Sequence, residues 1–105
     1  EYDRADALIY PTLCESFGFS LLEALTAGMP IIASDIPVNR ELAGDAARYY
    51  PPRDARALSD AMRELMGDGA LRARLSGAAL RRATEFCSWA EYAKALLALC
   101  ERAAC

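Results

Sequence analysis

The residues of this sequence best suited to chemistry are Glu15 and Glu23, which are spaced as E-x7-E on either side of Gly18. A carboxylate accepts charge-assisted hydrogen bonds from hydroxyl groups and so fixes their orientation. A glycine lets the backbone approach a ligand closely or adopt a positive φ. A helix beginning near Phe19 or Ser20 would offer free N–H groups and the positive end of its dipole. Together these features predict an anion site flanked by two carboxylates.

A nucleotide-sugar diphosphate would suit such a site, because the N–H groups stay in place while negative charge builds on the departing phosphate. Glu15 could then hold sugar hydroxyls, and Glu23 could hold a ribose diol. Each residue alone has a simpler explanation. A loop glutamate is usually solvated, a helical glutamate is usually an exposed helix former, and Gly18 could be an ordinary turn. Only the combination of strand, glycine loop, helix start and second carboxylate favours the site.

The segments around these residues predict a strand followed by a helix. The apolar run Ala7 to Tyr10 is hydrophobic enough for a central parallel strand covered on both faces. The segment Ser20 to Ala27 is helix-forming, and Gly28 ends it. Ligands of open α/β sheets bind at the carboxyl ends of the strands, where the intervening loop would lie.

The rest of the chain predicts an α/β fold: a partial Rossmann-like parallel sheet of about three strands, flanking helices and a helical C-terminal tail. Residues 1–52 form its β/α part with the E-x7-E motif, and residues 53–105 form its helical part. The further predicted elements are strands at Pro30 to Ser34 and Ala46 to Tyr50, a short helix from Pro37 through Leu42, and helices at Ala55 to Met66, Leu71 to Glu85 and Trp89 to Arg102.

The last predicted helix opens with a capping box, in which Ser88 and Glu91 would satisfy backbone donors reciprocally. Its apolar positions recur at helical spacing from Trp89 to Cys100. Packing against the core or against a partner is the expected role of that stripe.

Composition excludes several classes of function. A net charge of −3 over 105 residues provides no sustained basic surface, so nucleic acid and anionic membranes are poor candidates for the main partner. Four arginines gather on one predicted helix, where a solvated helix face explains them better than a polyanion site. They are Arg72, Arg74, Arg81 and Arg82.

Metal chemistry and secretion are also not indicated. The four cysteines show no C-x-x-C spacing and the sequence has no histidine, so no metal site is expected. Their scatter suggests reduced thiols and a cytoplasmic location. No apolar run approaches the roughly 20 residues that span a bilayer.

Several sequence blocks in order resemble the family-4 retaining glycosyltransferases of the GT-B fold, whose C-terminal domain carries E-x7-E within E-x-F-G-x-x-x-x-E-A. The resemblance runs nearly from end to end of the chain. The matching blocks are the strand run Ala5 to Thr12, the motif Glu15 to Ala24, the helix end and strand Ala27 to Ser34, the segment Glu41 to Ala47, and the Phe86 to Trp89 element with Cys87 inserted.

The resemblance implies roles for the candidate residues. Glu15 would be catalytic and contact the transferred sugar, and Glu23 would bind the ribose of the nucleotide. The implied donor-binding residues are Phe17, Gly18, Phe19, Ser20, Leu21 and Glu23, and backbone N–H groups from this stretch would surround sugar and phosphate. Ser20 stands where many relatives have Pro, and Asn39 where some have His; we attach no function to either difference.

The resemblance also implies that the chain is the donor-binding part of the C-terminal domain of a longer enzyme. That enzyme would transfer a hexosyl group from a UDP-, GDP- or ADP-sugar to a carbohydrate or lipid-linked acceptor with retention, without a metal or another cofactor. The missing N-terminal domain would hold the acceptor. We expect the isolated chain to be inactive, to bind donor with millimolar affinity at best, roughly −4 kcal/mol, and to self-associate. A cytoplasmic location is expected, and peripheral attachment to the inner membrane stays open.

Two alternatives remain at this stage. One is a sugar-nucleotide epimerase that shares the GT-B fold, although such proteins usually employ histidine. The other is a non-catalytic α/β interaction module, in which Glu15 and Glu23 would be surface carboxylates and the helical tail would mediate assembly.

Overall fold

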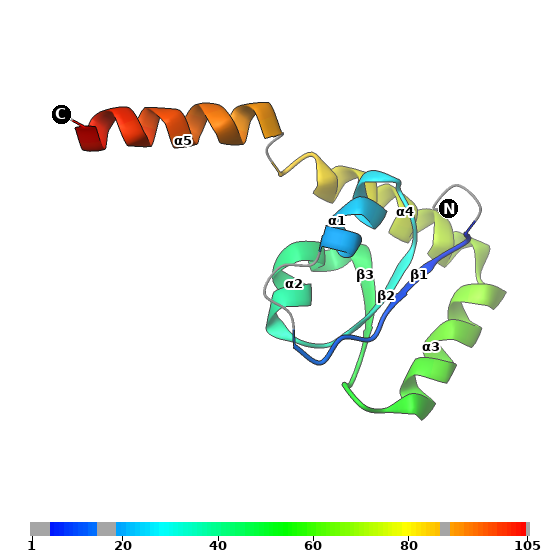
Figure 1. The fold of residues 1–105 in the computed structure, drawn as a ribbon. Coiled ribbons are helices and arrows are strands. Elements are labelled where there is room, and N and C mark those ends of the chain that lie inside the picture. The colour runs from blue at the N-terminus through cyan, green and yellow to red at the C-terminus, as the bar shows by residue number, and fades with distance from the viewer. Residues whose placement is uncertain (1–4, 15–18, 87–88, 105) are drawn as a thin grey trace.

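The computed structural model of the protein describes residues 5–14, 19–86 and 89–104, and it has the predicted α/β architecture (Figure 1). Three strands alternate with helices in the first half, and three helices follow. The elements in chain order are β1 (Leu8–Tyr10), α1 (Phe19–Thr26), β2 (Ile31–Ser34), α2 (Pro37–Ala43), the 3-10 helix η2 (Gly44–Ala46), β3 (Ala47–Tyr50), α3 (Ala55–Gly67), α4 (Gly69–Ala83) and α5 (Trp89–Ala104).

The three strands form one parallel sheet in the order β1-β2-β3. Ile32 of β2 pairs with Ile9 on one side and with Arg48 on the other. We expected β1 to be a central strand covered on both faces, but in the described sheet it lies at an edge and its residues are only half buried. The central strand is β2, since it pairs with a strand on each side. All four of its residues are buried.

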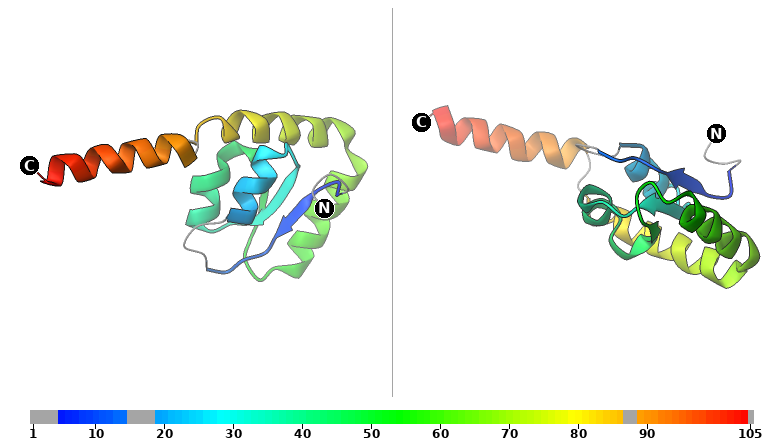
Figure 2. Two further views of the ribbon diagram at one scale, coloured as in Figure 1. Left: turned by 45° about the horizontal axis from the view of Figure 1, so that its top comes forward. Right: turned by 90° about the horizontal axis from the view of Figure 1, so that it is seen from below.

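Alternate residues of the strands serve two separate cores, one on each face of the sheet. Ile31 and Ala33 pack with α1, α2 and the second half of α4, whereas Ile32 packs with α3 and the first half of α4. This two-sided burial explains why the strands read as continuous apolar runs. The sheet is therefore sandwiched between helices (Figure 2).

Helix α4 runs along the edge where the strands begin, which we call the amino edge. The Ser76 hydroxyl donates to the carbonyl of Gly28 at 2.6 Å, just before β2. Arg82 Nε donates to the carbonyl of Leu42 at 2.9 Å, and Nη2 donates to that of Glu41, at the end of α2. Helix α4 thus ties together two of the turns that lead into strands.

The predicted helix boundaries agree with the structure to within about two residues, and the differences have local causes. Helix α4 begins at Gly69 rather than Leu71, because the Asp68 carboxylate accepts the N–H of Leu71 at 3.0 Å and caps the helix there. It ends at Ala83 rather than Glu85, because the N–H of Glu85 bonds to the carbonyl of Arg82 three residues back, in a tighter turn.

Helix α5 extends away from the body of the molecule (Figures 1 and 2), which accounts for a longest dimension of 57 Å against 26 and 23 Å. Its leucines, Leu96, Leu97 and Leu99, are about half exposed. Packing of its apolar stripe against the core is therefore not found within the described part of the chain, and packing against a partner stays a prediction. The predicted cap residue Ser88 and the side chains of Trp89 and Tyr92 lie outside what the structure describes.

None of the helices that the structure describes is long and apolar enough to cross a bilayer.

Candidate functional site at the carboxyl edge of the sheet

The candidate residues lie at the opposite edge, where the strands end. Because the strands are parallel and each is followed by a helix, α1, α2 and α3 all begin at this carboxyl edge. The first turn of α3 is already capped, since the Asp54 carboxylate accepts the N–H of Ala57 at 2.9 Å. Helix α2 starts with Pro37, which has no N–H to offer. The residues that precede α1 lie outside the described part of the chain, so the presentation of its first N–H groups to a ligand stays a prediction.

Helix α1 is anchored on one side and open on the other. Leu21, Ala24 and Leu25 are fully buried in the core. Ser20 and Glu23, three residues apart and so on the same side of the helix, are exposed. The structure thus brings two predicted donor-binding residues together on an accessible face. The side chain of Leu21 belongs to the core, so only its backbone could contact a donor.

Three of the predicted site residues, Glu15, Phe17 and Gly18, lie outside the described residues, as does the side chain of Phe19. The roles assigned to them, including that of Glu15 as the catalytic residue, stay predictions. The described chain does fix the residues on either side of them: Cys14 lies beyond the end of β1, and Phe19 begins α1.

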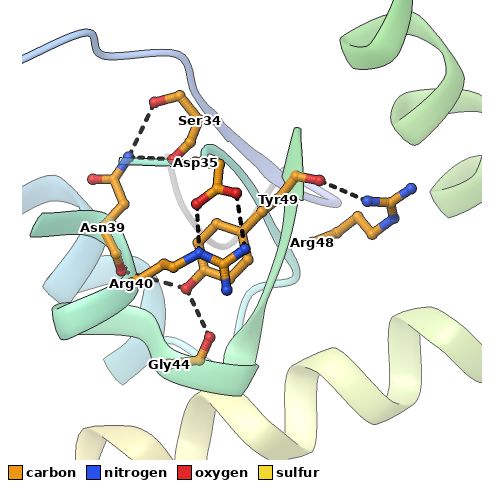
Figure 3. A network of polar contacts seen from close by, with 7 residues as sticks. All are labelled: Ser34, Asp35, Asn39, Arg40, Gly44, Arg48 and Tyr49. Carbon is orange, nitrogen blue, oxygen red and sulfur yellow. Dashed lines mark hydrogen bonds and ion pairs between the residues drawn. The ribbon is translucent and has the colours of Figure 1, made fainter. Parts of the chain in front are cut away.

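A buried polar cluster at this edge was not predicted as part of the site. Ser34, the last residue of β2, and Asn39 of α2 are both fully buried, and Figure 3 shows them in contact. The Ser34 hydroxyl donates to the carbonyl of Thr12 in the segment that follows β1. The sequence did contain a signal for this cluster: a serine ends an otherwise apolar strand, and an asparagine follows in the next short helix.

A second group of polar contacts fixes the β2–α2 turn. Arg40 binds both carboxylate oxygens of Asp35, with Nη2 at 2.9 Å from Oδ2, and lies 4.4 Å from the ring centre of Tyr49 (Figure 3). The hydrogen bond from Arg40 holds the pKa of the Asp35 carboxyl below its usual value. Burial raises the pKa of Tyr49 to about 12, so its hydroxyl stays protonated and donates to the carbonyl of Gly44 at 2.7 Å.

Two arginines, one in α2 and one in β3, are engaged within the fold. Arg40 is paired with Asp35. Arg48 lies 3.2 Å from the Glu64 carboxylate and donates to the carbonyl of Tyr49 at 2.6 Å. Neither guanidinium is therefore a ready partner for a diphosphate.

A mostly apolar hollow of about 300 Å³ lies at the same edge but on the α3 side of the sheet. None of the predicted site residues that the structure describes lines it. Its lining residues are Pro11, Leu13, Tyr50, Arg53, Asp54, Ala55 and Leu58.

Comparison with known proteins assigns this arrangement to a family. Residues 1–82 match the family model described as glycosyl transferases group 1. The O-antigen chain mannosyltransferase RfbU of Salmonella typhimurium is 38% identical over 61% of this chain and 18% of its own length. The glycogen synthase of Mycobacterium tuberculosis is 36% identical over 88% of this chain and 23% of its own length.

The fold is also that of a solved enzyme. The sucrose-phosphate synthase of Thermosynechococcus elongatus superposes with a TM-score of 0.85 at 26% identity, over 96% of this chain and 26% of that one. The chain thus spans about a fifth to a quarter of the length of the proteins it matches.

Proposed function

Because this chain belongs to the glycosyl transferases group 1 family, we propose that the protein it comes from is a retaining glycosyltransferase of the GT-B fold. It would transfer a hexosyl group from a nucleotide sugar to a carbohydrate or lipid-linked acceptor. The chain would supply part of the donor site, and a further domain would hold the acceptor. The names of the relatives, which include O-antigen chain mannosyltransferases and a phosphatidyl-myo-inositol mannosyltransferase, support acceptors of these two kinds.

The observation that carries this proposal is the placement of α1. The helix begins at the carboxyl edge, where ligands of parallel α/β sheets bind, and its buried leucines hold it there. Backbone N–H groups in its first turn would bind the diphosphate, and its dipole would favour the negative charge that develops on the leaving group. Fixed donors of this kind lower the barrier because they need no rearrangement during the reaction.

The two glutamates would orient the donor on either side of that helix start. The exposed carboxylate of Glu23 lies one turn into α1, within reach of a ribose diol beside the phosphates. Glu15, in the preceding loop, would contact the transferred sugar. Charge-assisted hydrogen bonds to hydroxyl groups make both contacts specific in direction.

Donor titration of the full-length protein tests the proposal. GDP-mannose, UDP-glucose and ADP-glucose are titrated in turn, and we expect at least one to bind. Glu23→Gln should weaken that binding by about 10- to 100-fold, because hydrogen bonds to a charged group are lost. Glu15→Gln should reduce the transfer rate more than the affinity.

Glu41→Gln is the matched control, since Glu41 is an exposed glutamate on the neighbouring helix α2. This variant should leave the donor affinity and the transfer rate unchanged. Equal affinities for the wild type and Glu23→Gln would contradict the role given to Glu23, and the absence of binding to all three nucleotide sugars would contradict the proposed function.

A further inference from the structure

The buried pair Ser34 and Asn39 lies where the pairing of strands β1 and β2 ends. The last paired residues of the two strands are Tyr10 and Ala33. Leu8 donates its N–H to the carbonyl of Pro30 at 2.9 Å. A parallel ladder repeats every two residues, so a longer ladder would offer the Ser34 carbonyl to the N–H of Thr12.

That carbonyl already has two donors. The N–H of Ile36 and Nδ2 of Asn39 each bond to it at 2.9 Å. A carbonyl oxygen has two lone pairs, so both are used and the ladder cannot continue through Ser34. Asn39 therefore helps to set the position at which the two strands separate.

Beyond the ladder, the Ser34 side chain makes the hydrogen bond that links β2 to the segment after β1. Its hydroxyl accepts from Asn39 Nδ2 at 3.1 Å and donates to the carbonyl of Thr12. The result is a hydrogen-bonded chain from α2, through the end of β2, to the segment beyond β1. Thr12 lies three residues before Glu15, so this chain holds the backbone that leads to the predicted catalytic loop.

The cluster is not what core packing alone would select. Asn39 Oδ1 and Thr12 Oγ1 are buried and have no hydrogen-bond partner among the described residues. Burying an unsatisfied polar atom costs about 1–3 kcal/mol, and an aliphatic residue at position 39 would avoid that cost. The amide of Asn39 also supplies the donor to both Ser34 oxygens, which an aliphatic residue could not do.

We propose that Ser34 and Asn39 are positioning residues for the donor site: they fix the backbone at Thr12, and through it the path of the chain toward Glu15. This inference rests on the proposed glycosyltransferase function. Neither residue would touch the donor. Their effect on the reaction would come from where they place the segment beyond β1.

Removal of the Ser34 hydroxyl in the full-length protein tests the inference. Ser34→Ala releases Thr12 and leaves the Asn39 bond to the Ser34 backbone in place, so the fold should persist. We expect the affinity for whichever of GDP-mannose, UDP-glucose or ADP-glucose the wild type binds to fall about fivefold to tenfold, the equivalent of one or two hydrogen bonds. Ser34→Thr, which keeps the hydroxyl, should restore it.

The control is Ser59→Ala, which deletes an exposed hydroxyl on α3. Thermal melting of each variant separates stability from affinity. A lowered melting temperature in Ser34→Ala with donor affinity within twofold of Ser59→Ala would show a purely structural role and overturn the inference. If the wild type binds none of the three nucleotide sugars, the proposed function fails, and the inference fails with it.

Discussion

The two edges of the sheet are built in contrasting ways. At the amino edge, α4 binds two strand-entering turns through Ser76 and Arg82, using contacts between residues 40 or more positions apart in sequence. The carboxyl edge has an accessible helix face, an exposed ion pair and two buried oxygens without a partner among the described residues. The long-range contacts of α4 thus lie at one edge, and the site that we propose lies at the other, where parallel α/β proteins bind their ligands.

The largest effect on stability is expected from Gly28→Ala at the amino edge. Gly28 has a φ of 68°, in the left-handed region that costs other residues about 1–2 kcal/mol. A Cβ there would also come within 2.9 Å of the Leu80 side chain of α4. We expect the free energy of unfolding, measured by urea titration, to fall by about that amount, with unchanged donor affinity.

Gly67→Ala is the matched control, because a Cβ at the end of α3 would meet no atom within 4 Å. It should be neutral or slightly stabilising. Equal losses in the two alanine variants would mean that the turn at Gly28 is not a special feature of the amino edge.

A smaller loss is expected from Arg82→Ala. The guanidinium binds the last carbonyls of α2 at Leu42 and Glu41 and lies 5.3 Å from the ring centre of Phe86. Water can replace part of these bonds, so the cost should be about 1 kcal/mol. Arg81→Ala, at an exposed neighbouring position, should change the urea midpoint much less. Donor affinity that fell with Arg82→Ala would show that the two edges are coupled.

The smallest effect is expected from Asp35→Asn at the carboxyl edge. The pKa of Asp35 is lowered by Arg40, so the ion pair contributes stability above the unfolded pKa of the carboxyl and loses it as the pH falls through the acid range. Both side chains are substantially exposed, and solvent screens such pairs. The urea midpoint at pH 7 should therefore stay within the spread of repeated measurements.

Thermal melts between pH 7 and pH 3 give the same comparison. Any excess of the wild-type melting temperature over that of Asp35→Asn should disappear as the carboxyl is protonated. A loss at pH 7 as large as that of Arg82→Ala would break the contrast between a structural amino edge and a binding carboxyl edge.

The sequence by itself determined the elements and their order. Apolar runs gave the strands, and Gly28, Pro37 and Pro51 marked boundaries that the structure reproduces closely, because capping, proline geometry and periodicity act over a few neighbouring residues. The same local signals located the start of α1 beside Gly18. The resemblance to glycosyltransferases is confirmed at the level of the group 1 family by the match to residues 1–82. Its finer parts, retention of configuration and the placement of Glu15 and Glu23 on either side of the donor, stay predictions.

Only the tertiary structure decided which residues meet. That Arg82 closes the end of α2, that Asn39 is fully buried, and that β1 lies at an edge of the described sheet all depend on contacts between distant segments. The exposed leucines of α5 make the same point: an apolar stripe predicts burial, but only a neighbouring surface can provide it. Periodicity within a helix predicts which face is apolar, whereas the surface that packs against this face depends on the tertiary structure.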